Sequence, residues 1–247
     1  MNSYILLGIK IFTAIVLAVI FGNGSVVMFN RIPTHWFEEI GEDGQKSLPP
    51  ELQDLGDGTR QRLPSTPWKY VFTGYFGIVG IFLALRFSLQ YEIAVLFVLA
   101  IVLEMAICDG KYRIVPDTFS ILLAVSALGF VGFQERWWEP IAGAVTGGFL
   151  VLIVYFFGKI IYRKEIIGGA DLKFFAALGL IAGSGGIVIL FLGTQLLMGV
   201  HALTLALRKR LEKNQTLPLI PYGFAALTVY FLFLWDVISF IIFQFTI

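Results

Sequence analysis

Long apolar stretches alternate with short polar connections along the whole chain. We count eight apolar segments in the 247 residues. A helix needs about 20 apolar residues to cross a bilayer, so the pattern predicts an all-α, polytopic membrane helix bundle with about eight transmembrane helices. The segments are approximately residues 4–29, 70–88, 91–108, 118–134, 138–162, 171–183, 186–207 and 220–246.

The segment 171–183 is short for a membrane span, so we expect it to be broken, tilted or extended through Gly183–Gly186. The only extended polar stretch, 30–69, is interrupted by several glycines and by Pro49-Pro50. We expect it to form a small lid or a partly ordered loop. The predicted organisation is a first transmembrane helix at 1–29, a loop at 30–69 and a membrane-embedded domain at 70–247.

Composition supports a membrane protein and removes several other classes. Hydrophobic residues make up 57% of the chain and charged residues 14%, against about 45–50% and about 25% in soluble domains. The net charge of +1 gives no reason to expect a nucleic-acid partner. The single cysteine, Cys108, excludes a disulfide framework and a cysteine-based zinc site. The first apolar segment is too long for a signal-peptide core, so we interpret it as a retained helix.

Lysine and arginine are concentrated in alternate connections. The regions 109–117, 159–173 and 208–213 are basic, whereas the connections at 90–92, 134–139 and 183–186 carry almost no positive charge. The positive-inside rule therefore predicts that the basic regions and the 30–69 stretch face the cytoplasm. Asp109 and Asp171 would then lie on the same, cytoplasmic face.

Asp109 and Asp171 stand at the ends of apolar segments, where a carboxylate is costly and is a functional-site candidate by default. Two carboxylates held about 3–5 Å apart cannot both ionise readily, so one keeps its proton near neutral pH. The ionised member can take a proton from water, and the protonated member can polarise a peptide carbonyl. The pair therefore suggests aspartic-protease chemistry, which needs no metal and no cofactor.

The residues around both aspartates suit such a site. We expect Gly168 and Gly169 to adopt backbone conformations closed to other residues and to let a substrate strand approach. Pro116 prevents the loop from continuing as a helix, and Asp117 is placed to cap the helix that starts near Thr118. Three basic residues lie in the same motifs, namely Lys111, Arg113 and Lys173. We expect Lys173 to pair with a loop carboxylate or a lipid phosphate.

The two motifs resemble the signatures of the type IV prepilin peptidases, integral-membrane aspartic proteases. Asp109-Gly-Lys-Tyr-Arg-Ile-Val-Pro-Asp117 is similar to their first aspartate motif, and Gly168-Gly-Ala-Asp171-Leu-Lys173 is similar to their G-x-G-D-x-K motif. Two further stretches, 24–33 and 221–225, resemble the family's motifs after the first helix and at the start of the last helices. The resemblance thus extends over nearly the whole chain.

The resemblance implies a substrate, a location and a mechanism. The substrate is a prepilin or pseudopilin with a short basic leader that ends in glycine and precedes an apolar helix. The enzyme is expected in the bacterial cytoplasmic membrane, with lipid as its other partner and with Asp109 and Asp171 catalytic at the cytoplasmic face. S-adenosylmethionine is implied only where the new N-terminus is also methylated, an activity to which we assign no residue here.

This chain departs from the family pattern in two places. Ala170 stands where the second motif has its second glycine, and a backbone with φ above zero would be strained there. Many bacterial relatives carry two C-x-x-C pairs in the loop after the first helix. This chain has no cysteine there, so no structural zinc is carried over.

Other interpretations stay open from sequence alone. Each aspartate could be only a helix cap. The pair could form a proton relay in a small transporter, although such groups usually lie near the bilayer midplane. A non-catalytic scaffold for pilus assembly would need neither aspartate. Glu104 and Asp236, inside apolar segments, are expected to meet partners on other helices, and Cys108 is expected to be a small packing residue.

Overall fold

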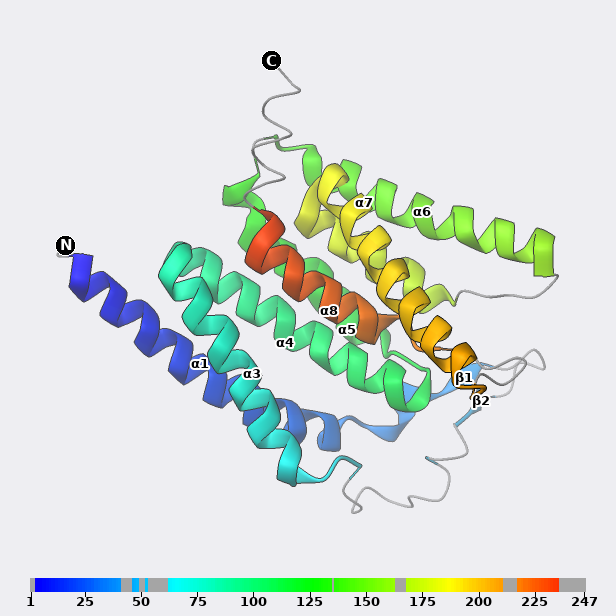
Figure 1. The fold of residues 1–247 in the computed structure, drawn as a ribbon, viewed down its shortest axis with the longest axis horizontal. Helices are drawn as coiled ribbons and strands as arrows, with labels where there is room; N and C mark the ends of the chain where they lie inside the picture. The colour runs from blue at the N-terminus through cyan, green and yellow to red at the C-terminus, as the bar shows by residue number, and fades with distance from the viewer. Residues whose placement is uncertain are drawn as a thin grey trace. The chain divides into compact units, whose positions relative to one another are not determined.

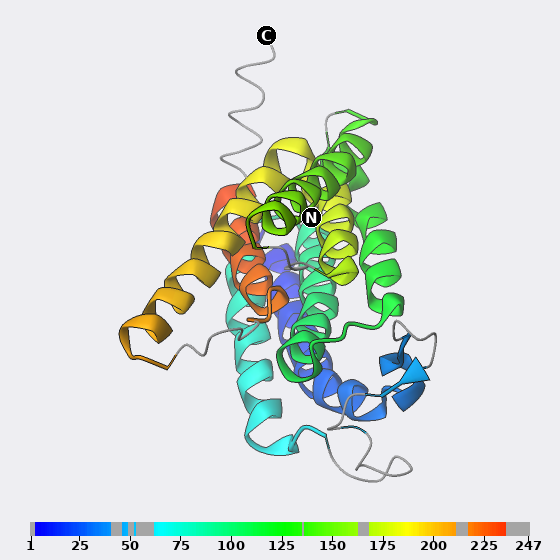
Figure 2. The same ribbon diagram turned by 90° about the vertical axis from the view of Figure 1, so that its right-hand side faces the viewer.

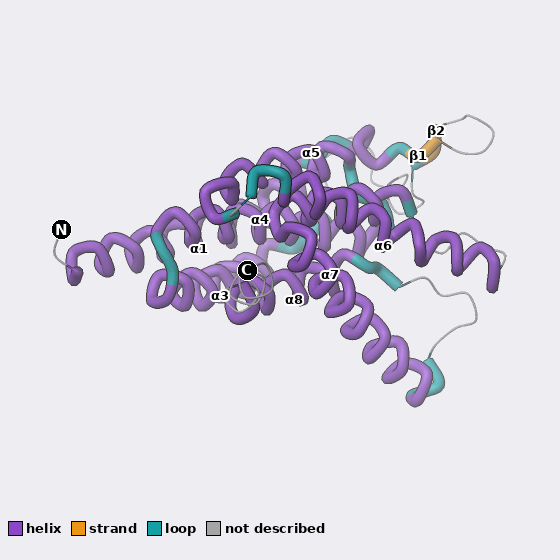
Figure 3. Tube along the Cα trace, turned by 90° about the horizontal axis from the view of Figure 1, so that it is seen from above, coloured by secondary structure: helices purple, strands orange, loops and turns teal. Residues whose placement is uncertain are grey.

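A computed structural model describes residues 3–40, 46–48, 52, 62–134, 136–162, 168–210 and 217–235. Asp236 lies outside this part of the chain. The described residues are almost entirely helical, with one pair of two-residue strands (Figure 3). In order the elements are α1 (Ser3–Arg31), η1 (Thr34–Phe37), β1 (Glu39–Ile40), β2 (Lys46–Ser47), α3 (Ser65–Arg86), α4 (Leu89–Tyr112), α5 (Asp117–Ser126), η2 (Ala127–Phe133), α6 (Glu139–Tyr162), α7 (Gly169–Leu207), α8 (Ile220–Val229) and η3 (Tyr230–Leu234).

The predicted fold class is confirmed. Within the described residues, five helices are long and apolar enough to cross a membrane, namely α1, α3, α4, α6 and α7. Two shorter apolar helices, Asp117–Phe133 and Ile220–Leu234, match the fourth and eighth predicted segments. The sixth and seventh predicted segments are both contained in α7. The chain is a polytopic helical membrane protein.

The chain divides into two compact units, Met1–Asp117 and Thr118–Ile247, which are described separately. In the first unit, α1 and α3 pack through small residues, as their adjacent ribbons show (Figure 1). A Cβ atom on Gly22 would overlap Thr73, and one on Gly80 would lie 3.0 Å from the Cβ atom of Ala14. Small residues let membrane helices approach closely enough to gain packing energy.

Two hydrogen bonds join the end of the 30–69 stretch, just before α3, to the end of α1. The Asn30 side chain donates to the Leu63 carbonyl oxygen at 2.9 Å, and its Oδ1 accepts from the Leu63 backbone N–H at 2.8 Å. Between these residues, β1 and β2 pair antiparallel with Glu39 opposite Ser47. The expected small loop region therefore begins and ends at one place, next to the end of α1.

In the second unit, α7 is two helices that fold back on each other. Gly183 has φ 70° and ψ −179°, a conformation essentially restricted to glycine. The rings of Phe175 and Phe191 lie 5.1 Å apart although 16 residues separate them, so the second arm runs back along the first. Figures 1 and 2 show the yellow-green first arm turning into the yellow-to-orange second arm. The expected break in this segment is confirmed.

Side chains from the connection between η2 and α6 hold the turn of α7. Gln134 donates to the carbonyl oxygens of Leu180 and Ile181 at 3.0 and 3.1 Å. The Glu139 carboxylate accepts from the Ser184 backbone N–H at 3.0 Å and from its hydroxyl at 2.6 Å. These bonds satisfy the backbone groups that a helix leaves unpaired at its ends.

This turn gives a graded stability prediction. Glu139→Ala leaves two donors of Ser184 without their acceptor, and we expect the free energy of unfolding to fall by about 1–3 kcal/mol. Ser184→Ala removes one of the two bonds and should cost less, while Glu139→Gln keeps an amide oxygen and should behave as wild type. Thermal unfolding of the full chain in detergent measures the series. Equal stability of Glu139→Ala and wild type would show that the hydrogen bonds of Glu139 do not stabilise the turn.

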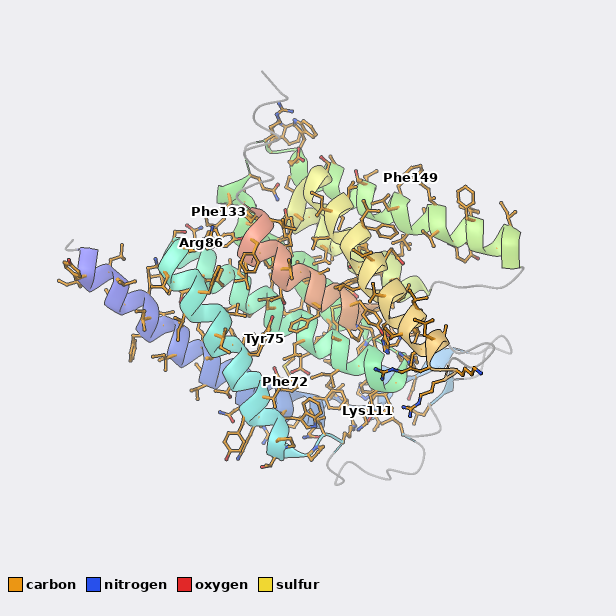
Figure 4. All side chains as sticks on the ribbon, in the orientation of Figure 1. Phe72, Tyr75, Arg86, Lys111, Phe133 and Phe149 are labelled. Atoms are coloured by element: carbon orange, nitrogen blue, oxygen red, sulfur yellow. The ribbon has the colours of Figure 1, made fainter. Side chains whose placement is uncertain are left out.

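Glycines bring α6 against the first arm of α7. Cβ atoms on Gly143 and Gly179 would each overlap the carbonyl oxygen of the other, and one on Gly147 would overlap the Phe175 carbonyl oxygen. The two backbones are therefore in direct contact, and only glycine fits at these positions. Phe149, on the same helix, is instead 60% exposed and points away from the helix axis (Figure 4). This packing positions the arm of α7 that begins beside Asp171.

Candidate active site

Asp109 lies in the last turn of α4, which continues to Tyr112. We expected Asp109 to end this segment, in a turn marked by Gly110, and that expectation is wrong. Glycine is tolerated inside a helix at a modest cost, and α4 packs closely enough to offset it. The Asp109 side chain is only 9% exposed, so it is a buried carboxylate at a helix end.

The helix stops at Arg113, which adopts the left-handed conformation with φ 60° and ψ 15°. Its backbone N–H donates to the Asp109 carbonyl oxygen at 3.1 Å, which caps the helix. Pro116 follows and is buried, and α5 begins at Asp117, one residue earlier than expected. The Ile-Val-Pro segment thus separates two helices, as its sequence predicts.

Aromatic and basic side chains gather beside Asp109 in the first unit. Tyr112 stacks on Phe29 of α1, with centroids 6.0 Å apart, and meets the edge of Phe37 at 5.2 Å. The Arg62 guanidinium lies 5.6 Å from the centre of the Phe37 ring. Lys111, labelled in Figure 4, donates to the Arg62 carbonyl oxygen and lies over the rings of Phe29 and Tyr112.

Two further polar groups lie deeper on α4. Glu104 is 1% exposed and its carboxylate lies beside the hydroxyl of Ser25 on α1, which is the helix–helix contact that we expected. Cys108 is fully buried and unpaired, as expected for a packing residue. The resemblance motif at 24–33 is therefore structural in part, since Ser25 meets Glu104 and Asn30 holds Leu63.

Asp171 occupies the third position of α7 and caps its start. Its Oδ2 accepts from the Gly168 backbone N–H at 3.2 Å, while its own N–H donates to the Gly168 carbonyl oxygen. The capping role that we weighed as an alternative is therefore present. The cap engages Oδ2 and does not exclude a catalytic role for the same carboxylate.

The glycines before Asp171 differ from expectation. Gly168 has φ −84° and ψ 162°, an extended conformation open to any residue, and Gly169 is already helical. Ala170 is also in the right-handed helix, so alanine is unstrained there. Our expectation of conformations restricted to glycine is wrong, whereas a Cβ atom on Gly169 would have no neighbour within 4 Å among the described residues. Lys173 is exposed in the same first turn.

The start of α8 packs one turn after Asp171. A Cβ atom on Gly223 would lie 2.7 Å from the ring of Phe174, so glycine is needed for this contact. The neighbouring Tyr222 hydroxyl is hydrogen-bonded to Nδ1 of His201 on the second arm of α7. The resemblance motif at 221–225 thus holds α8 against the arm of α7 that carries Asp171.

Sequence reasoning missed four residues, two of them near Asp109 and two at the turn of α7. Arg62 was only one of several loop charges, Tyr112 lay inside the first motif without a role, and Gln134 and Glu139 were part of a connection with little charge. Each depends on contacts between distant segments, which no local pattern reveals. Asp109 and Asp171 lie in different units, so their pairing stays a prediction.

Known proteins share the region that carries both aspartates. Residues 94–203 match the sequence profile of the type IV leader peptidase family. This match covers less than half of the chain. The matched region runs from α4, which carries Asp109, to the second arm of α7, so it includes both motifs of the family.

A curated member of the family is similar over a longer stretch. The chain is 27% identical over 162 residues to a protein of Bacillus subtilis (strain 168) named prepilin leader peptidase/N-methyltransferase. The similarity covers 64% of this chain and 63% of that protein, so less than two thirds of the relative's length is matched. No solved structure matches the chain.

Proposed function

We propose that this protein is a membrane aspartyl endopeptidase that removes the leader peptide of type IV prepilins or pseudopilins. The observation that carries the proposal is the family match across 94–203, which includes Asp109 and Asp171 at helix ends. The match to a peptidase family favours proteolysis over a proton-relay transporter or a scaffold, because the match includes both aspartate motifs.

The two carboxyl groups divide the chemistry of peptide hydrolysis. The ionised carboxylate takes a proton from a water molecule, whose oxygen attacks the carbonyl carbon of the scissile bond. The protonated carboxyl donates to the carbonyl oxygen as negative charge develops there. When the C–N bond breaks, the departing amine takes the proton that came from water, and a hydroxyl of the tetrahedral intermediate returns its proton to the other aspartate as the carbonyl re-forms. The dyad is then left with one shared proton. The proposal needs no metal and no cofactor, and it concerns leader cleavage alone.

The charge pattern supports a cytoplasmic site. Lys111 and Arg113 follow Asp109, and Lys173 follows Asp171, which is the distribution of a cytoplasmic face. A prepilin presents its leader at that membrane boundary. Among the described residues nothing lies within 4 Å of a Cβ atom placed on Gly169, which favours access of a peptide strand to the start of α7. The proposed partners are therefore the precursor and the surrounding lipid of the bacterial cytoplasmic membrane.

The proposal is tested with the purified full chain in lipid nanodiscs. A precursor with a basic leader ending in glycine and a following apolar helix is added, and mass spectrometry measures both products. We expect one cut, directly after the leader glycine, without an ion gradient. An intact precursor in the presence of folded protein would contradict the proposal.

A further inference from the structure

Arg62 is a buried charge that the proposed mechanism does not use. Its side chain is 8% exposed, and within the described part of the chain no acceptor reaches its Nη1. A buried guanidinium without a full set of acceptors is costly, so it needs a physical reason. The contacts around Arg62 supply this reason.

Three separate contacts fix the position of Arg62. The following residue, Leu63, is held at both its N–H and its carbonyl by Asn30 at the end of α1. The Arg62 carbonyl oxygen accepts from Lys111, two residues beyond Asp109. The guanidinium itself lies over Phe37, which in turn packs against Tyr112. The charge is therefore preorganised at the end of α4.

Cys108 precedes Asp109 on α4 and is fully buried. Arg62, Glu104 and Asp109 all lie within electrostatic range of its thiol. Among the other cations near this end of the first unit, Arg31, Lys111 and Arg113 are all exposed. Solvent and salt screen exposed charges strongly and buried charges much less, so the buried cation Arg62 acts on this end of α4 with little screening.

We infer that Arg62 is a positioning residue for Asp109, a fixed buried cation that stabilises negative charge on the face of α4 that carries Cys108 and Asp109. The inference rests on the proposed function, in which Asp109 must alternate between charged and protonated forms. Arg62 touches neither water nor peptide in this role, and it acts through the carboxylate alone.

The first test compares Arg62→Gln and Arg62→Lys with wild type in the nanodisc cleavage assay. We expect Arg62→Gln to lower kcat by about tenfold to a hundredfold, the size of a lost charge interaction in partly buried surroundings, while KM stays within about twofold. Arg62→Lys keeps the charge and should recover most of kcat. If folded Arg62→Lys were as slow as Arg62→Gln, or if KM alone changed, the positioning role would be wrong.

The matched control is Arg86→Gln. Arg86 also lies over phenylalanine rings in the first unit, 5.3 Å from Phe82, but at the far end of α3 and exposed (Figure 4). We expect its kcat and KM to equal those of wild type.

The second test does not depend on activity. Cys108 is the only cysteine, so its S–H stretching band in the infrared spectrum reports the local field without ambiguity. Arg62→Gln should move this band, and Arg62→Lys and Arg86→Gln should leave it near wild type. An unmoved band in folded Arg62→Gln would overturn the inference. A chain that shows the band shift but cleaves no precursor would refute the proposed function while supporting the local role of Arg62.

Discussion

Asp109→Asn and Asp171→Asn should each lower kcat for leader cleavage by about a thousandfold or more, because each removes one member of a two-carboxyl mechanism. Asparagine has nearly the shape of aspartate but neither takes a proton from water nor donates as an acid. At position 171 an amide oxygen can still accept from the Gly168 backbone N–H, so the start of α7 should stay folded. The effect should therefore fall on the chemical step.

Single-turnover cleavage in nanodiscs measures this effect, with thermal unfolding as a check on the fold. Glu92→Gln is the control for Asp109→Asn, since it makes the same carboxylate-to-amide change in the first turn of the same helix. Glu92 is fully buried near Lys10, far along α4 from Asp109. We expect it to cleave at the wild-type rate. Normal cleavage by either aspartate variant would refute the dyad.

Gly143→Ala and Gly179→Ala should each destabilise the second unit by about 3 kcal/mol or more. A single added methyl group would overlap a backbone oxygen of the facing helix, and no side-chain movement relieves that overlap. Alanine favours a helix over glycine by about 1 kcal/mol, so helix propensity alone would predict a gain in stability rather than a loss. Cleavage activity should fall as well, since α6 supports the arm that carries Asp171.

Gly199→Ala provides the matched control for these variants. Gly199 lies in the second arm of α7, and a Cβ atom there would have no neighbour within 4 Å. We expect Gly199→Ala to be as stable as wild type or slightly more stable. Thermal unfolding of all three variants in detergent compares them. Wild-type stability of Gly143→Ala would show that α6 and α7 are not in backbone contact.

The length and position of the apolar segments were sufficient to predict most of the fold. Within the described residues, all eight apolar segments correspond to helices or arms of helices, because the membrane requires each span to satisfy its own backbone hydrogen bonds. The break in α7 was also foreseeable, since Gly183-Ser-Gly-Gly is a poor helix sequence and the segment before it is short. Both features depend on local composition.

The site was less predictable, because its details depend on contacts between distant residues. The end of α4 lies at Tyr112 rather than Asp109 because the stop comes from the left-handed Arg113, a conformation that arginine rarely adopts. Gly168 and Gly169 have ordinary backbone angles, so these glycines leave open space but do not satisfy a conformational requirement. Arg62 reaches the end of α4 through contacts between distant residues, since Asn30 holds the neighbouring Leu63 and Lys111 donates to the Arg62 carbonyl oxygen.

The central claim is that Asp109 and Asp171 perform one reaction together. The most direct test is the single-turnover rate of the double variant Asp109→Asn/Asp171→Asn, compared with the rates of the two single variants and wild type. Residues that act as one unit show strongly non-additive losses. We expect the double variant to cleave within about threefold of the slower single variant. Losses that multiply, so that the double variant is slower by the product of the two single effects, would show that the aspartates act independently and would contradict the dyad.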